Sequence, residues 1–240
     1  MSEGPRPRNA VAVWWVRLDG AADPEVAERG SLSDAERARA ARLAPVERRR
    51  FVASRAALRS LLGRHLDCPP AGVRIEIAAA GKPHLPDAPL QFSLAHSHDW
   101  AVVALAECAV GVDLERIAPL PEIDSLSNRF LSARERAALA ALPVDERLRA
   151  FYDCWCDKEA YLKALGCGLS MDPASFTVAV APAPPALLAS PLGERECRRW
   201  RLVRLAAPRS YAAALAVDAP RPVLAEYLWQ AKDARMPDKP

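Results

Sequence analysis

Two segments of the sequence match at an offset of 99 residues, and this repeat restricts the possible folds more than any other feature. Leu32–Leu43 reads LSDAERARAARL and Leu131–Leu142 reads LSARERAALAAL, with seven of twelve positions identical. Each segment contains Ser-x-x-Glu, starting at Ser33 and at Ser132, which is a capping box that satisfies the first free amides of a helix. The repeat therefore predicts two helix-containing lobes of similar structure.

The segments that flank this repeat also correspond. VAVWWVRL from Val11 falls on VGVDLERI from Val110, and both are strand-like. A helical segment from Phe51 answers one from Phe151. Further pairs with strand patterns are VRIEIA with FTVAVA, and FSLAHSHDWAVVALA with WRLVRLAAPRSYAAALAV. Each half is expected to run strand, helix, helix, strand and strand pair, so we predict an α+β fold of two lobes related by a pseudo-twofold axis. A ligand is expected in the cleft between them.

The repeat also sets the expected domain boundaries. We assign residues 1–108 to an N-terminal lobe, 109–218 to a C-terminal lobe, and 219–240 to a tail with one helical turn at Leu224–Trp229. The Pro-rich stretch 181–195 is expected to be a loop.

Composition excludes several classes of protein. The net charge of +3 is small for a nucleic-acid-binding protein, and no apolar run reaches the length of a membrane span. Six cysteines without a CxxC pair give no zinc-finger spacing, and no secretion signal is recognisable. We therefore expect a cytoplasmic protein with reduced thiols, no membrane partner and no nucleic-acid partner.

The segment GVDLE places two carboxylates on one face of a strand. Residues two apart share a strand face, so Asp113 and Glu115 project together. Such oxygen ligands suit Mg²⁺, whose shell substrate phosphates commonly complete. The alternative is a solvated strand end. The matching positions of the first half are Trp14 and Val16, so the pair belongs to one lobe only.

A second polar pattern lies in CWCDKEAYLKALGCGL. Trp155, Glu159 and Lys163 are spaced i, i+4 and i+8, which puts them on one helix face. An ordinary surface ion pair is the alternative. Gly166-x-Gly168 follows and suggests a helix end with a close backbone approach. Cys154 and Cys156 lie about 200° apart around the helix, so they cannot share a ligand.

Lysine is rare in this sequence, with five lysines against 28 arginines. Three lysines lie away from the C-terminal segment, at Lys82, Lys158 and Lys163, and they are candidates for a role that a compact ammonium fills better than a forked guanidinium. Gly81-Lys82-Pro83 precedes His96 and His98, which could share a strand face. A zinc site there lacks a third ligand, so a phosphate contact or a structural histidine is favoured.

An arginine-rich helix is expected between Arg48 and Leu66. Phe51, Leu58 and Leu62 form its apolar stripe, and Arg48, Arg55 and Arg59 line up beside that stripe. These arginines could form a solvated face or bind phosphates through charge-assisted hydrogen bonds.

The order GKP, F-x-x-x-H-S, GVDLE and F-Y-x-x-W-x-x-K-E-A-x-x-K-x-x-G-x-G-L resembles the 4′-phosphopantetheinyl transferases of the larger, surfactin-synthetase-activating type. The resemblance runs from about Arg48 to Phe176. The resemblance implies a monomeric enzyme whose two lobes form a pseudo-dimer. Such an enzyme transfers the phosphopantetheine arm of coenzyme A to a serine of an apo acyl or peptidyl carrier protein and releases adenosine 3′,5′-bisphosphate.

The resemblance also implies residue roles. Asp113, Glu115 and Glu159 would hold Mg²⁺, and Glu159 or a water that it orients would be the base. Lys163 would contact the phosphates, Lys82 and His96 would hold the 3′-phosphate, and Arg55 and more weakly Arg59 would add phosphate contacts. Lys158 points away from this face and is expected to be structural.

The sequence departs from the family pattern at Ala95, where a serine is usual and could donate a hydroxyl hydrogen bond to a phosphate. The carrier protein is expected to dock on residues 119–126, with Leu120 and Leu126 in its contact surface. The alternatives to an active transferase are a catalytically weak carrier-binding paralogue and, less favoured, a nucleic-acid-binding module built on the arginine helix.

Overall fold

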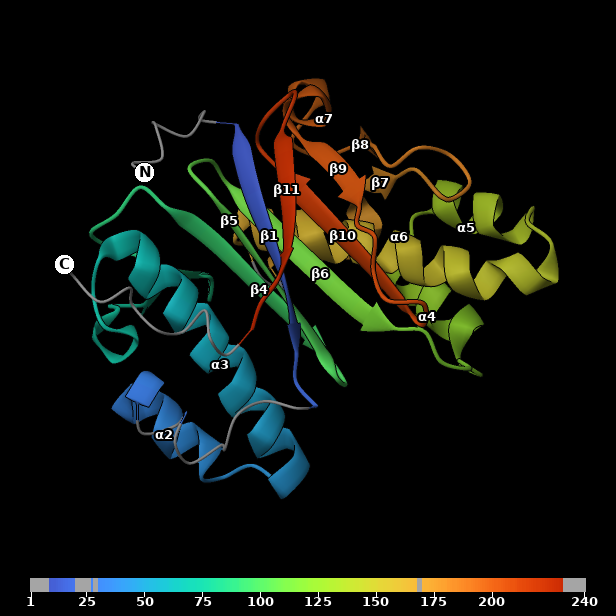
Figure 1. The fold of residues 1–240 in the computed structure, drawn as a ribbon. Helices are drawn as coiled ribbons and strands as arrows, with labels where there is room; N and C mark the ends of the chain where they lie inside the picture. The colour runs from blue at the N-terminus through green and yellow to red at the C-terminus, as the bar shows by residue number, and fades with distance from the viewer. Residues whose placement is uncertain (1–8, 20–26, 28–29, 168–169, 231–240) are drawn as a thin grey trace.

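The computed structural model describes residues 9–19, 27, 30–167 and 170–230. The chain forms two lobes that share a strand, two helices and a strand pair, as the repeat predicts, and the second lobe contains further helices (Figure 1). The elements of the first lobe are β1 (Ala10–Arg17), α2 (Asp34–Ala40), α3 (Pro45–Leu66), η1 (Pro70–Gly72), β2 (Glu76–Ile77), β3 (Pro83–His84), β4 (Gln91–Ser97) and β5 (Trp100–Ala106). Those of the second are β6 (Val110–Arg116), α4 (Ile123–Phe130), α5 (Ala133–Ala140), α6 (Val144–Leu165), η3 (Pro173–Ser175), β7 (Thr177–Val178), β8 (Leu187–Ala189), α7 (Glu194–Arg199), β9 (Arg201–Arg204) and β10 (Tyr211–Val217).

The sheets of the two lobes share one register. The first sheet has the order β11-β1-β5-β4, where β11 spans Val223–Leu228, and the second has the order β6-β10-β9. In the first lobe Val11 pairs with Ala106, and in the second Val110 pairs with Val217. Val11 and Val110 are 99 residues apart. The pseudo-twofold relation therefore extends to individual strand pairs.

The capping boxes reveal the same relation in the helices. Both boxes form as expected, at Ser33 and at Ser132. In the first lobe Glu36 accepts a hydrogen bond from Arg59 of α3, at 2.5 Å. In the second lobe Glu135 accepts from Lys158 of α6, at 2.6 Å. Each glutamate thus caps the start of a short helix and ties that helix to the long helix of its own lobe.

These pairs correct the alignment of the long helices. Matching Phe51 with Phe151 implies an offset of 100, but α3 and α6 begin and end at an offset of 99. At that offset Arg59 corresponds to Lys158, and both bind the capping glutamate. The buried contact, and not the shared phenylalanine, sets the structural equivalence.

The C-terminal segment differs from the sequence-based expectation. Residues 224–229 do not form a helical turn, because Val223–Leu228 is strand β11, parallel to β1. Tyr227 stacks on Trp14 with ring centroids 4.5 Å apart. Trp14 is the first-lobe counterpart of Asp113. Tyr227 of β11 therefore covers the first-lobe position that corresponds to the carboxylate Asp113 in the second lobe. The pattern of alternating apolar residues in a strand this short is easily mistaken for a helical turn.

Two further expectations need correction. The stretch 181–195 is not entirely loop, since β8 pairs there with β7. The strands expected over 73–78 and 176–181 are limited to the two-residue strands β2 and β7. Short two-stranded pairs carry too little periodicity for the sequence to fix their ends.

The strand β4 lies next to β6, which brings the two sheets side by side, and α6 crosses behind β6 and β10 (Figure 1). Two serines of β4 bind β6. The amide of Val112 donates to Ser93 Oγ at 3.1 Å, and the amide of Arg116 donates to Ser97 Oγ at 3.1 Å. These hydrogen bonds join the lobes along the strand that carries GVDLE.

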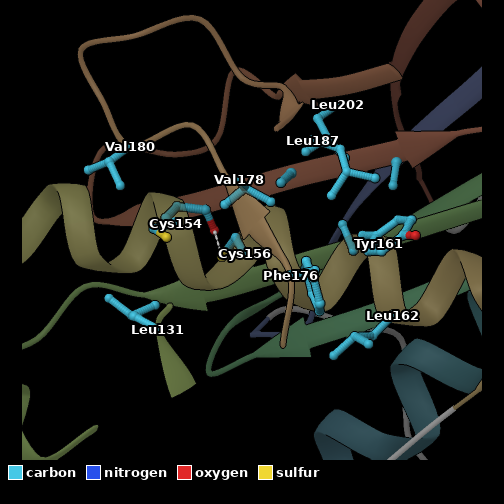
Figure 2. Close-up of a cluster of buried hydrophobic side chains, with 14 of the residues drawn as sticks. Leu131, Cys154, Cys156, Tyr161, Leu162, Phe176, Val178, Val180, Leu187 and Leu202 are labelled. Atoms are coloured by element: carbon cyan, nitrogen blue, oxygen red, sulfur yellow. Dashed lines mark hydrogen bonds between the residues drawn. The ribbon is translucent and has the colours of Figure 1, made fainter. Parts of the chain in front are cut away.

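The core of the second lobe surrounds α6. Figure 2 shows Cys154 and Cys156 in this core together with Tyr161, Phe176 and Val178. Within the described residues, no helix is long and apolar enough to cross a membrane.

Candidate active site

A cleft of about 930 Å³ lies between the lobes. We call it the interlobe cleft and define it by the site residues that line it, which are Arg55, Lys82, His96, Asp113, Glu115, Trp155, Glu159 and Lys163. Arg55, Lys82 and His96 come from the first lobe, and the carboxylates come from β6 and α6 of the second. The structure thus brings together every proposed site residue except Arg59.

Gly111 explains how the carboxylate strand comes so close to α6. A Cβ atom at Gly111 would lie 2.1 Å from the Ala160 carbonyl oxygen and 2.3 Å from the Ala164 amide nitrogen. Only glycine permits this approach of strand to helix. Asp113 and Glu115 follow on the same strand, while Glu159 and Lys163 belong to the helix segment that it contacts.

Asp113 and Lys163 form an ion pair at the base of the cleft, with Nζ 2.6 Å from Oδ1. Burial lowers the pKa of Lys163, but the charge and hydrogen bond of Asp113 and the charge of Glu159 outweigh it, so that pKa is raised. The other carboxylate oxygen, Asp113 Oδ2, is buried without a hydrogen-bond partner. A buried carboxylate oxygen without a partner is energetically unfavourable unless a cation or donor reaches it.

Glu115 and Glu159 add negative charge around Asp113. Burial and the charge of Asp113 raise the pKa of Glu115 to about 7, although Ser97 donates a hydrogen bond to it at 3.1 Å. Burial and the charge of Asp113 also raise the pKa of Glu159. Three carboxylates whose charges oppose one another form an electrostatic environment that favours a cation.

These carboxylates do not form a complete protein cage for a metal. No group of three or more His, Cys, Asp or Glu side chains among the residues that the structure describes is arranged to hold a metal ion. Mg²⁺ is commonly bound by one or two carboxylates together with substrate phosphates and waters, so it does not need such a cage. The unpartnered oxygen of Asp113 and the all-oxygen donor set fit this mode of binding.

The opposite wall of the cleft is positive. Burial, and then the charges of Arg55 and Lys163, lower the pKa of His96, so the positive charge on this wall comes from Arg55 and Lys82. Arg55 lies over the ring of Phe51, 5.6 Å from its centroid, and its nearest carboxylate oxygen belongs to Glu36 at 3.9 Å. A ligand with several negative charges would be attracted to this wall.

Arg59 does not belong to the cleft, contrary to the expectation that it contacts a phosphate. Its side chain is 4% exposed and is bound to Glu36 and to the carbonyl oxygens of Pro70 and Val73. The helical period places Arg59 beside the apolar stripe of α3, but that side of the helix faces the interior of the first lobe. A buried guanidinium that is bound to a carboxylate and to two carbonyl oxygens has a structural role.

Other residues from the sequence analysis also lie elsewhere. Lys158 is fully buried on Glu135 and the Phe176 carbonyl, which confirms the structural role expected for it. His98 lies beyond the end of β4 with φ of +50°, so it does not share a strand face with His96. Gly168, the second glycine of the expected turn, lies outside the described residues.

The sequence analysis missed an aromatic corner of the cleft. Phe130 of α4 contacts Trp155 edge to face, with centroids 4.9 Å apart, and Arg129 lies over the Phe130 ring. Met171 and Pro173 line the cleft as well. No local sequence pattern indicates Phe130 or Met171 as cleft residues, because both reach the cleft only through the tertiary fold.

Comparison with known proteins identifies a family. The sequence model of the 4′-phosphopantetheinyl transferase superfamily (ACPS) matches residues 109–216. 4′-Phosphopantetheinyl transferase HetI of a Nostoc species is 34% identical over 240 residues, which cover 95% of this chain and 95% of the relative. 4′-Phosphopantetheinyl transferase psf-1 of Bacillus pumilus is 34% identical over 64% of this chain and 69% of its own length. 4′-Phosphopantetheinyl transferase Sfp of Bacillus subtilis is 33% identical over 50% of this chain and 54% of its own length.

Proposed function

This chain belongs to the 4′-phosphopantetheinyl transferase superfamily, and we propose that its interlobe cleft performs the Mg²⁺-dependent transfer of 4′-phosphopantetheine from coenzyme A to a serine of an apo acyl or peptidyl carrier protein. The observation that carries this proposal is the division of charge across the cleft. Three carboxylates of the second lobe face Arg55, Lys82 and His96 of the first. That arrangement suits a metal-bound pyrophosphate with a further phosphate beside it.

Asp113, Glu115 and Glu159 are the proposed metal ligands. When bound, Mg²⁺ would neutralise charge on the pyrophosphate and on the departing nucleotide. The support for this assignment is the unpartnered Asp113 Oδ2 and the mutual repulsion of the three carboxylates.

Glu159 is the proposed general base. The serine oxygen of the carrier attacks the phosphorus that bears the pantetheine arm, and the bond from that phosphorus to the oxygen of adenosine 3′,5′-bisphosphate breaks. The serine proton passes to Glu159 or to a water that Glu159 orients. Its position in the cleft, on the same helix face as Lys163, supports this role.

Lys163 is proposed to move from Asp113 to the phosphates. Its ammonium already lies within the cleft, on the carboxylate that we assign to the metal. If a metal takes over Asp113, the ammonium becomes available to the charge that develops on the leaving nucleotide.

His96 and Arg55 are the proposed contacts of the 3′-phosphate. Ala95 lies beside His96 and also lines the cleft, but it has no hydroxyl group to donate. The grip on this phosphate therefore depends on charge more than on side-chain hydroxyl hydrogen bonds.

The carrier protein is proposed to dock on residues 119–126 and the rest of α4, beside the carboxylates. This segment directly follows β6, and α4 exposes Asp124 and Ser125. Leu120 and Leu126 are half-buried and pack against the second-lobe core, so they support this surface more than they extend from it.

The test is to incubate the protein with coenzyme A, Mg²⁺ and an apo carrier protein and to weigh the carrier. We expect a gain of one phosphopantetheine, which EDTA abolishes and which Glu159→Gln reduces by about 100-fold or more, the usual range for a general base. Glu146→Gln, at an exposed position in the first turn of the same helix, is the matched control and should transfer normally. The absence of any mass gain with several unrelated carriers would refute the proposal.

A further inference from the structure

Lys82 makes contacts that differ from those of a free phosphate-binding lysine. It lies in the first lobe, directly after the turn in which the Gly81 amide donates to the Ala78 carbonyl. Its Nζ, however, donates to two carbonyl oxygens of the second lobe, that of Val110 at 3.1 Å and that of Ala164 at 2.9 Å. Two of the three donors of the ammonium are thus already used within the protein.

The two carbonyls belong to the elements that carry the proposed catalytic side chains. Val110 begins β6, three residues before Asp113, and Ala164 follows Lys163 in the last turn of α6. The last carbonyls of a helix have no partner within the helix, and they form the negative end of its dipole. A cation on the Ala164 carbonyl therefore stabilises the end of α6 at the edge of the cleft.

The stem of Lys82 is held as well. A Cβ atom at Gly166, which has φ of +71°, would lie 2.8 Å from Lys82 Cδ and 3.3 Å from its Cβ. Gly166 ends α6 in the left-handed conformation and leaves space for the lysine stem. Lys82 is thus anchored at its tip by two carbonyls and along its stem by the end of the helix.

We propose that Lys82 is a positioning residue that clamps the first lobe to both β6 and α6, and that it sets the distance between the positive wall and the carboxylates of the cleft. Burial lowers the pKa of Lys82 to about 8, which agrees with an ammonium enclosed by protein groups rather than exposed in an open phosphate site. This inference rests on the proposed function and replaces the role as a 3′-phosphate ligand that the family resemblance implies for Lys82.

The two roles predict different kinetics. A clamp acts on the geometry of the reacting groups, so Lys82→Met should lower kcat by about tenfold and change the KM for coenzyme A by less than about threefold. A phosphate ligand acts on binding, so its removal would mainly raise the KM. Methionine keeps the length of an unbranched side chain and removes the three donors.

Comparison of coenzyme A with 3′-dephospho-coenzyme A separates the roles directly. For a clamp, Lys82→Met loses the same factor in kcat/KM with both donors, within about twofold. His96→Ala is the control, and its loss should be larger with coenzyme A than with the dephospho compound. A Lys82→Met loss that is confined to coenzyme A would overturn the proposal. If the unmodified protein transferred nothing from coenzyme A, the proposed function would fail, whereas the anchoring of Lys82 would remain measurable by stability.

That stability measurement is a double-mutant cycle between Lys82→Ala and Gly166→Ala, followed by thermal unfolding. The methyl group of Gly166→Ala meets the lysine stem, which cannot move aside while its tip is anchored. We expect the drop in Tm caused by Gly166→Ala to be at least halved in the Lys82→Ala background. The backbone strain at Gly166 is common to both backgrounds and cancels. An equal drop in both backgrounds would show that the stem is free, and the clamp would be refuted.

Discussion

Lys158 Nζ lies 2.6 Å from Glu135 Oε1, and neither side chain is exposed to solvent. Glu135 also accepts from the amides of Ser132 and Val178, and Lys158 also donates to the Phe176 carbonyl. One buried ion pair therefore joins α5, α6 and the start of β7.

Removing one partner of this pair should destabilise the fold strongly. Lys158→Met leaves Glu135 as a buried charge without its counterion, which costs about 3 kcal/mol, or roughly 10 °C in Tm for a chain of this size. Arg198→Met, in the exposed Arg198–Glu194 pair, is the control and should cost less than about 0.5 kcal/mol. Thermal unfolding of the two variants measures the difference, and equal effects would contradict a structural role of Lys158.

Substitution of Gly111 should separate β6 from α6. Gly111→Ala places a methyl group against two backbone atoms of the helix, which cannot rotate away, and overpacking of this kind costs about 1–3 kcal/mol. Gly72→Ala meets only Pro69 Cδ at 3.9 Å and serves as the control. We expect a clearly lower Tm and slower transfer for Gly111→Ala, and no such change for Gly72→Ala. A normal Tm for Gly111→Ala would mean that the strand and the helix accommodate the methyl group without loss of stability.

The cysteines near the catalytic face should be dispensable for the reaction. Burial raises the pKa of both Cys154 and Cys156, which disfavours the reactive thiolate. Replacing Cys154, Cys156 and Cys167 with alanine should leave transfer largely intact and lower Tm by a few degrees through small cavities. Loss of transfer in a variant that still unfolds cooperatively would instead indicate a thiol mechanism.

Stability should depend on pH through Lys82. The pKa of its ammonium is about 8 in the folded protein against a usual value of 10.5. Between these values the unfolded state binds more protons than the folded state, so this residue makes the folded protein more stable as the pH rises. Between pH 7.5 and pH 9.5, the free energy of unfolding of the unmodified protein should increase by on the order of 1 kcal/mol relative to that of Lys82→Met, as measured by denaturant unfolding. A gap between the two proteins that is constant with pH would show that the pKa of Lys82 is normal.

The proposed carrier surface can be tested at an exposed residue of α4. Ser125→Arg adds bulk and charge without touching the core, so it should raise the KM for the carrier several-fold and leave the KM for coenzyme A unchanged. Replacing Leu120 or Leu126 with aspartate would confuse docking with folding, because both leucines pack on the second-lobe core. An unchanged carrier KM in Ser125→Arg would place the docking surface elsewhere.

The sequence predicted which residues line the cleft better than it predicted which groups their side chains contact. Strand and helix periodicity put Asp113 with Glu115 and Glu159 with Lys163, and the repeat placed both pairs in one lobe. Periodicity cannot show which side of a helix is covered, and for that reason Arg59 was assigned to the cleft although Glu36 binds it in the interior. Lys82 shows the same limit, because its contacts with Val110 and Ala164 cross the boundary between the lobes. Phe130 and Met171 depend on how α4 and the segment after α6 return to the cleft, and local pattern does not encode that path.

The stacking of Tyr227 on Trp14 has a consequence for how the two halves of the chain can change over evolutionary time. At the 99-residue offset of the repeat, Asp113 corresponds to Trp14 and Lys163 corresponds to Arg64. The Arg64 guanidinium lies 6.0 Å from the centroid of the Trp14 ring. The first copy of the repeat thus has a cation–aromatic contact where the second has an ion pair, and among the described residues β11 adds a strand beside β1 that has no counterpart in the β6-β10-β9 sheet. Replacements of Trp14 are therefore expected to act through packing, and replacements of Asp113 through the chemistry of the proposed site, so we expect these two equivalent positions to tolerate different residues.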